Sequence, residues 1–398
     1  MLNREIFVND PVNSRLANNG VAQVKDDLSK GALDTLEYEL RTFVCDGAYE
    51  KGLDKILSNY LLAFKSNSEQ PGVWISGFFG SGKSHLAKML RTLWTNQTLN
   101  NGSDARSITD LPESIAKQLD ELSTIAEVNG GLYAASGTLG AGTADKVRLA
   151  LLGIIFKSAG LPEQYHLARF VMWLKSAGVF DQVKEFVESK SKAKDSVDIW
   201  TKELKNLHVS PVLHEAVLQS IPGMGSDIKE VREMLRAQYK IVDDVTNDEM
   251  VSAIVDAISK NGELPLTLVV LDEVQQYIGD NVQRAFDVQE VVETCSGASA
   301  LKSKVLFVAT GQSALTGMTN LQRLMGRFQV PVQLEDTDVD KVIRKVILQK
   351  KESAKPVIRE MVDDNLGEIS RHLRGSTIEH HRDDEKWIVP DYPLLPVR

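Results

Sequence analysis

The stretch Gly77–Ser84 reads G-F-F-G-S-G-K-S and fits the spacing G-x-x-x-x-G-K-[ST]. Glycines let a backbone wrap closely around a phosphate group, so that successive N–H groups point inward. We expect Lys83 to bring a positive charge to the β- and γ-phosphates of ATP, and the Ser84 hydroxyl to bind Mg²⁺. The pattern predicts contacts to the phosphates from Gly77, Phe78, Phe79, Gly80, Ser81, Gly82, Lys83, Ser84 and His85.

The neighbouring sequence supplies the context that such a loop needs. Val73–Ser76 is a short apolar strand candidate, and Gly82–Trp94 has the periodicity of a helix. A helix that starts at the loop adds its positive N-terminal dipole to an anion site. From average residue usage, a chance match in a chain of this length has a frequency on the order of 1–2%. The alternative, a glycine-rich turn with an exposed lysine, is therefore disfavoured.

Paired carboxylates follow a second apolar run. Leu266–Leu271 is continuous and uncharged, and Asp272 and Glu273 come directly after it. A buried strand ending there would carry both side chains to the edge of a sheet, beside the phosphates. We expect Asp272 to hold the magnesium water shell and Glu273 to polarise the attacking water. Acidic residues after strands are common, so this interpretation depends on the glycine-rich loop.

Polar residues also end a third run, Val305–Ala309, which is followed by Thr310, Gly311 and Gln312. In ATPases of the AAA+ type, the strand beside the paired carboxylates ends in a sensor residue that hydrogen-bonds the γ-phosphate or the lytic water. Thr310 occupies that place, and Gln312 is the second candidate. The alternative is a hydroxyl that only shapes the turn.

An arginine lies in the segment before the last strand candidate. Leu321–Phe328 contains Arg323 and Arg327 and precedes Val330–Leu334. AAA+ ATPases keep at this place an arginine finger that completes the site of a neighbouring subunit, because a planar guanidinium spans two phosphate oxygens. Arg327 is the first candidate and Arg323 the second. The alternative is a charge that stabilises the end of a helix.

The residues named so far resemble a known family. Val73–His85, Leu271–Asn281 and Ala309–Gln312 are similar to the corresponding segments of the BrxC/PglY family. These are large P-loop ATPases of BREX bacteriophage-exclusion systems. The run W-I-S-G-F-F-G-S-G-K-S-H is more specific than the general phosphate-loop pattern. Members of the family are longer, and the end of this sequence, from Trp387 to Arg398, reads like an ordered segment cut off in mid-course. We therefore expect an N-terminal fragment.

The resemblance implies a role in antiviral defence. Proteins of these systems modify host DNA by adenine methylation and block phage replication together with a methyltransferase, a phosphatase-like protein and small accessory proteins. It implies an oligomeric, cytoplasmic hydrolase that assembles or remodels a DNA-associated complex, with DNA contacted directly or through partners. The alternative is a nucleotide-gated scaffold with little or no turnover. The residues themselves predict that the protein binds ATP and Mg²⁺ and hydrolyses the ATP.

The apolar runs predict the sheet that positions these residues. The strand candidates, most of them separated by helical segments, are Val73–Ser76, Leu132–Ser136, Leu266–Leu271, Val305–Ala309 and Val330–Leu334. Strands that alternate with helices indicate a parallel sheet in an α/β protein, here a P-loop NTPase of the AAA+ type.

Helical periodicity fills much of the remaining chain. The segments between the second and third strand candidates are Asp145–Lys157, Gln164–Ala177, Phe180–Ser189, Val197–Leu207, Val212–Gln219, Ile228–Tyr239 and Asp248–Lys260. We predict an N-terminal subdomain over 1–66, an ATPase core over 67–336 with a helical insertion over 143–262, and the start of a helical lid over 337–398. Val342, Ile343, Val346 and Ile347 form the expected apolar stripe of the lid.

Composition narrows the class of protein further. The chain has 398 residues, 42% of them hydrophobic and 25% charged, as in globular proteins. Its net charge of −9 argues against coating of nucleic acid by bulk positive charge. The sequence shows no apolar stretch long enough to span a membrane, and no signal-peptide pattern at Met1. Its two cysteines cannot build a disulfide framework. We expect a cytoplasmic protein.

Overall fold

The computed structural model describes most of the chain. The described residues are 3–10, 12, 29–139, 146–190, 198–221, 223–297, 301, 303–312, 315, 319–334, 341–376, 379, 381 and 384–394. The sequence also predicts a short strand at Val21–Val24, which lies outside these ranges. Within them, no helix is long and apolar enough to cross a membrane.

A five-stranded parallel sheet forms the centre of the molecule, in the order β2-β3-β4-β1-β5. The strands are β1 (Val73–Ser76), β2 (Leu132–Thr138), β3 (Leu266–Asp272), β4 (Val305–Gly311) and β5 (Val330–Gln333). Each coincides with a predicted strand to within two residues. The α/β class and the parallel sheet expected from the sequence are confirmed.

The two faces of the sheet contact different hydrophobic clusters. Along β3, Leu268 and Val270 face one cluster, while Val269 and Leu271 face the other. Both faces are covered, so every residue of β3 and β4 is buried. This explains why these strands read as continuous apolar runs instead of alternating ones.

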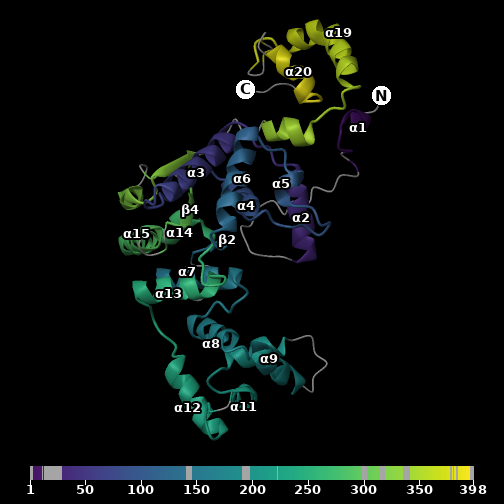
Figure 1. The fold of residues 1–398 in the computed structure, drawn as a ribbon. Coiled ribbons are helices and arrows are strands. Elements are labelled where there is room, and N and C mark those ends of the chain that lie inside the picture. Colours follow the sequence, from purple (N-terminus) through teal and green to yellow (C-terminus); the bar gives the residue numbers. More distant parts are fainter. Residues whose placement is uncertain are drawn as a thin grey trace.

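Helices before β2 cover one face, and they are blue and purple in Figure 1. They are α2 (Lys30–Arg41), α3 (Ala48–Lys65), α4 (Lys83–Thr95), α5 (Ala105–Ile108) and α6 (Glu113–Glu127). Residues 36–61 share this cluster with β1, β3, β4 and β5. This part of the predicted 1–66 subdomain therefore packs directly on the sheet.

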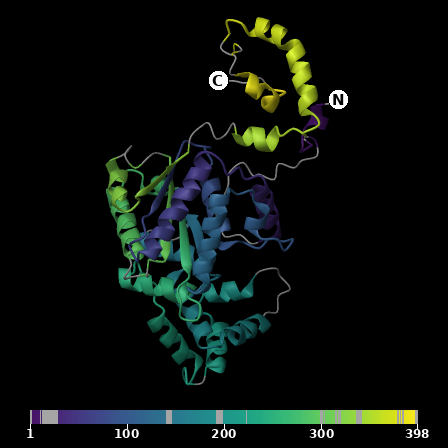
Figure 2. The ribbon, with the colours of Figure 1, turned by 45° about the horizontal axis from the view of Figure 1, so that its top comes forward.

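The other face is covered by α7, α13, α14 and α15. The helices of the insertion between β2 and β3 are α7 (Val147–Ser158), α8 (Tyr165–Ser176), α9 (Phe180–Ser189), α10 (Ile199–Lys205), α11 (Pro211–Ser220), α12 (Ile228–Gln238) and α13 (Asn247–Ile258). Those that follow β3 are α14 (Val274–Ile278) and α15 (Val282–Ser296). In Figures 1 and 2, α8–α12 extend beyond α7 and α13, away from the sheet. The insertion is helical, as the sequence predicts.

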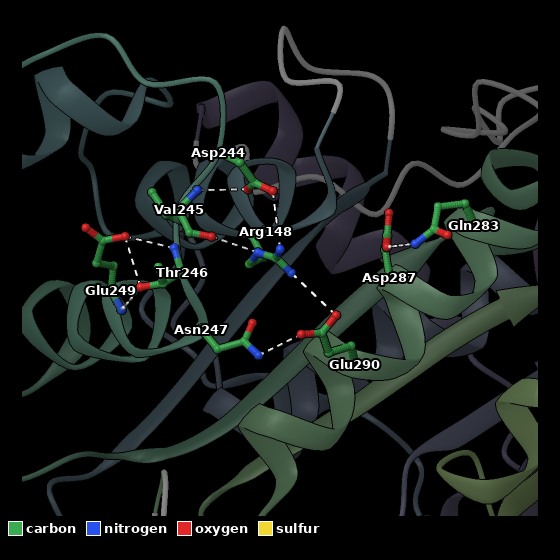
Figure 3. A network of polar contacts seen from close by, with 9 residues as sticks. All are labelled: Arg148, Asp244, Val245, Thr246, Asn247, Glu249, Gln283, Asp287 and Glu290. Atoms are coloured by element: carbon green, nitrogen blue, oxygen red, sulfur yellow. Dashed lines mark hydrogen bonds and ion pairs between the residues drawn. The ribbon is translucent and has the colours of Figure 1, made fainter.

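A polar network ties both ends of the insertion to the core (Figure 3). Arg148 of α7 donates from Nε to the Val245 carbonyl at 2.8 Å and pairs with Asp244 at 3.3 Å. Its other nitrogen lies 3.7 Å from a carboxylate oxygen of Glu290 on α15. Asn247 donates to the same carboxylate at 2.8 Å. The network connects the first helix of the insertion, the segment that leads into its last helix, α13, and α15.

The C-terminal helices form a separate small cluster with the beginning of the chain. It joins α19 (Lys355–Leu373) and α20 (Glu385–Asp391) to Ile6, the last residue of α1 (Asn3–Ile6), and to Phe7. Phe7 bridges Lys350 in antiparallel fashion. Figure 2 shows the purple helix α1 beside the yellow helices α19 and α20. Residues 6 and 7 therefore pack with the predicted lid.

The expected apolar stripe of the lid forms only in part. Ile343–Ile347 is a turn of π-helix with no fully buried residue; Ile343 is half-buried and packs against the C-terminal cluster, whereas Ile347 is 53% exposed. A π-turn shifts the hydrogen bonds from i+4 to i+5, so residues spaced for an α-helix no longer share one face. Arg344 instead points to Asp391 and to the Trp387 ring.

Candidate phosphate-binding site

The glycine-rich loop connects β1 to α4 at the carboxyl edge of the sheet. Gly80 and Gly82 have φ values of +89° and +85°, which residues with a Cβ rarely adopt. A Cβ on Gly77 would lie 2.5 Å from the Ser81 Oγ. A residue with a Cβ would therefore strain the backbone at Gly80 and Gly82 and clash with Ser81 at Gly77. Phe79 is 83% exposed on this loop, and Phe78 is 43% exposed.

Lys83 begins α4 and folds back over the loop. Its ammonium donates to the carbonyls of Gly77 at 2.8 Å and Phe78 at 2.7 Å. Burial lowers the pKa of Lys83, and the charges of Asp272 and Glu273 oppose this shift. Within the described residues, Lys83 forms no ion pair. Its charge is near both carboxylates and is bonded to neutral carbonyls only.

Ser84, Asp272 and Thr310 meet across three neighbouring strands. The Ser84 hydroxyl, one residue into α4, donates to Asp272 Oδ1 at 3.2 Å. The Thr310 hydroxyl at the end of β4 donates to the same oxygen at 2.5 Å. Since β4 lies between β1 and β3, the parallel order brings these three residues to one point. The two predicted magnesium ligands, Ser84 and Asp272, thus lie within hydrogen-bond distance of each other.

Glu273 holds an unusual backbone conformation. Its φ of 57° and ψ of 32° lie in the left-handed region, which costs a residue with a side chain roughly 1 kcal/mol. Its N–H donates to Thr310 Oγ1 at 2.9 Å and to Asp272 Oδ1 at 3.2 Å, which maintains this turn. The side chain of Glu273 is exposed at the edge. Strained residues of this kind cluster at functional sites.

The two sensor candidates lie differently. Thr310 is 1% exposed, and its hydroxyl is engaged by Asp272 and the Glu273 N–H. The Gln312 N–H donates to Gln275 Oε1 at 2.6 Å, and the residue is exposed. Between them, a Cβ on Gly311 would lie 2.3 Å from the Trp74 ring. Thr310 therefore orients Asp272, whereas Gln312 lies at the outer end of β4.

His85 faces the interior of the protein. Its ring contacts Phe43 edge-on, with centroids 5.7 Å apart. Burial lowers its pKa, which favours the neutral imidazole. Its side chain thus belongs to the packing beneath α4, and its contribution to a phosphate site would come from the backbone N–H.

Arg327 and Arg323 lie near the opposite edge of the sheet. The Arg327 carbonyl accepts a 2.7 Å hydrogen bond from Gly72, just before β1. Its guanidinium pairs with Glu69 at 3.0 Å and with Glu293 of α15. Arg323 is exposed in the 3-10 turn Arg323–Gly326. The structure does not bring either arginine to the glycine-rich loop of its own chain.

Two residues near the loop have no sequence signal. Gln275 lies two positions after Glu273 and accepts from Gln312. Tyr49 of α3 donates from its hydroxyl to the Ser81 carbonyl at 3.2 Å. Gln275 lies within the segment Leu271–Asn281 but has no role assigned from the sequence, and Tyr49 is 32 residues away in sequence from its partner. A pattern of spacing could not identify them.

A protein-only metal site is absent from the part of the chain that the structure describes, where no three His, Cys, Asp or Glu side chains gather. A magnesium ion normally takes one or two protein ligands and completes its shell with phosphate and water. Ser84 and Asp272 fit that arrangement. A comparison with models of known protein families gives no match.

Proposed function

We propose that the chain binds ATP with Mg²⁺ and hydrolyses it as a P-loop ATPase of the AAA+ type. The observation that carries the proposal is the 3.2 Å hydrogen bond from Ser84 to Asp272. It connects the glycine-rich loop to the first of the paired carboxylates, which is the arrangement that a magnesium-nucleotide site requires.

The described side chains fit the nucleotide. Lys83 lies over the loop and, among the described residues, donates to carbonyls and forms no ion pair, so it is able to turn to the β- and γ-phosphates without breaking one. The N-terminal N–H groups of α4 would hold the phosphate oxygens. Magnesium, when bound, neutralises charge between the phosphates, and Ser84 and Asp272 would be its protein ligands. Glu273, exposed next to Asp272, would polarise water beside them.

Two features support the AAA+ assignment within P-loop ATPases. The strand that ends in Thr310 lies directly beside the strand of the paired carboxylates. A cluster of helices follows the core, as a lid would. With the resemblance to the BrxC/PglY family, we propose an oligomeric, cytoplasmic ATPase that assembles or remodels a DNA-associated BREX defence complex. Its partners would be the methyltransferase, the phosphatase-like protein and small accessory proteins, with DNA reached directly or through them.

A second candidate is a nucleotide-gated scaffold that binds ATP and turns it over slowly or not at all. The ion pairs of Arg327 with Glu69 and Glu293 favour it, because they engage the guanidinium that an ATPase would use at a neighbouring subunit. An ATP turnover assay with and without DNA and partners separates the two. Turnover supports the ATPase, and ATP binding without turnover under any condition supports the scaffold.

Binding itself is tested with Lys83→Ala. Loss of the ammonium should lower ATP affinity tenfold or more, about 1.4 kcal/mol per factor of ten. The melting temperature without nucleotide should stay nearly unchanged, because Lys83 makes no ion pair with the described residues. Titration calorimetry measures the affinity. Lys117→Ala, which removes the same charge from the exposed face of α6, is the control. Equal ATP affinity in Lys83→Ala and wild type would remove the phosphate-loop assignment.

A further inference from the structure

A tyrosine hydroxyl braces the glycine-rich loop from beneath. Tyr49 lies in the first turn of α3 and is 7% exposed. Its hydroxyl donates to the Ser81 carbonyl at 3.2 Å. This carbonyl belongs to the peptide that joins Ser81 to Gly82, in the part of the loop where the phosphate-binding turn passes into α4.

The same hydroxyl occupies the space beside Gly82. A Cβ built on Gly82 would lie 1.9 Å from Tyr49 Oη and 3.2 Å from the Cζ that carries it. Gly82 also has a φ of +85°. The backbone conformation and the hydroxyl therefore each require a glycine here, and together they fix how close the loop lies to α3.

The position of Tyr49 is set independently of the loop. A Cβ on Gly52, one turn further along α3, would lie 2.8 Å from Val332 of β5, so helix and strand are in close contact. Lys55 donates to the Pro331 carbonyl at 2.9 Å. The Tyr49 ring also contacts Phe43 edge-on at 5.9 Å. Contacts with β5 thus fix the position of α3, and α3 in turn fixes the position of the Tyr49 hydroxyl.

Peptide geometry transmits this contact to the ligand side. A trans peptide is planar, and its C=O and N–H point in opposite directions. A hydrogen bond that draws the Ser81 carbonyl toward α3 therefore turns the Gly82 N–H away from α3. We infer that Tyr49 is a positioning residue that aims the Gly82 N–H at the phosphates of the bound nucleotide. This inference rests on the proposed function.

Tyr49→Phe tests the inference, and Tyr60→Phe is a matched control on the same helix. Tyr60 is also buried, and its hydroxyl donates to a backbone carbonyl, that of Lys304, at 3.0 Å. Lys304 precedes β4 at the opposite edge of the sheet. Both variants lose one hydroxyl-to-carbonyl bond, so their melting temperatures without nucleotide should fall by similar amounts. Only Tyr49→Phe should weaken ATP and ADP binding, by about three- to tenfold.

Hydrogen exchange provides a readout that needs no nucleotide. Amides of the loop, from Gly77 to His85, should exchange faster in Tyr49→Phe than in Tyr60→Phe. Equal loop exchange in both variants would overturn the inference that Tyr49 positions the loop. Equal ATP affinity in Tyr49→Phe and wild type would overturn it as well. So would an equal loss of affinity in Tyr49→Phe and Tyr60→Phe. If wild type bound no nucleotide, the proposed function and the inferred purpose of the brace would fail together. The exchange data would still report whether the loop is held.

Discussion

The two edges of the sheet, one at the carboxyl ends of its strands and one at their amino ends, hold charges in different ways. At the edge of the glycine-rich loop, Lys83 is bonded to carbonyls, and Asp272 accepts from the hydroxyls of Ser84 and Thr310. At the opposite edge, Arg327 pairs with Glu69 and Glu293. Both edges carry charges of both signs. Arg327, Glu69 and Glu293 form ion pairs, whereas Lys83 and Asp272 form none with the described residues.

This difference separates a site for a ligand from a structural contact. Charges that are bonded to neutral groups can receive a phosphate or a magnesium ion without first breaking an ion pair. Charges that already neutralise one another add a small stability and offer little to a ligand. Helices α4 and α14 begin at the carboxyl edge, so helix dipoles also favour anions there. The comparison predicts that equivalent substitutions at the two edges have different effects.

The largest effect is expected from Glu273→Gln. The amide keeps the size of the side chain but loses the charge that polarises water, so turnover should fall about a hundredfold or more while ATP stays bound. Glu293→Gln is the control, since the same substitution at the opposite edge removes only a partner of Arg327. It should lower the melting temperature slightly and leave turnover intact. Steady-state ATPase rates and ATP titrations measure both. Normal turnover by Glu273→Gln would show that this glutamate is not the base.

Arg327→Ala tests the opposite edge directly. If the guanidinium serves its two ion pairs, the substitution should reduce the free energy of unfolding by about 1 kcal/mol and leave turnover per site unchanged. Arg323→Ala, which removes an exposed arginine, should do less. Denaturant unfolding and ATPase rates measure these effects.

An arginine finger would produce the reverse result for Arg327→Ala. Turnover would fall by about 10³-fold or more with stability preserved, and wild-type activity would rise steeply with protein concentration. Mixing with Glu273→Gln would then restore activity, because a mixed interface pairs an intact Glu273 with an intact Arg327. That outcome would show that Arg327 also serves the nucleotide site, and it would confirm the arginine finger predicted from the sequence.

The smallest effect is expected from pH. Burial lowers the pKa of Lys83 below the usual 10.5. ATP binding requires the protonated amine, so affinity should begin to fall at a lower pH than for an ordinary lysine, by less than about tenfold. Folding stability should change in the opposite direction, because the unfolded chain binds more protons between the two pKa values. Calorimetry across alkaline pH measures the affinity, and Lys83→Ala should flatten the curve. A flat curve for wild type would contradict the role of its charge.

The sequence predicted the strands of the sheet because buried parallel strands are continuous apolar runs. It predicted the neighbourhood of Ser84 and Asp272 because the carboxyl ends of parallel strands share an edge. It could not predict that Thr310 would bond to Asp272, since a hydroxyl at a strand end carries no directional signal. Tyr49 was missed because its partner is a backbone carbonyl, which no residue type reveals. The π-turn at Ile343–Ile347 was missed because its apolar spacing suits an α-helix.

The order of the strands has a consequence for synthesis of the chain. The neighbours of β1 are β4 and β5, and the neighbour of β2 is β3. The first two strands of this sheet to be synthesised, β1 and β2, are therefore not partners, and both must wait until the whole helical insertion has been translated. Until then their apolar residues and unpaired backbone groups are open to other chains. A nascent chain of this topology depends on its helices, or on a chaperone, to protect β2 until β3 emerges and β1 until β4 emerges.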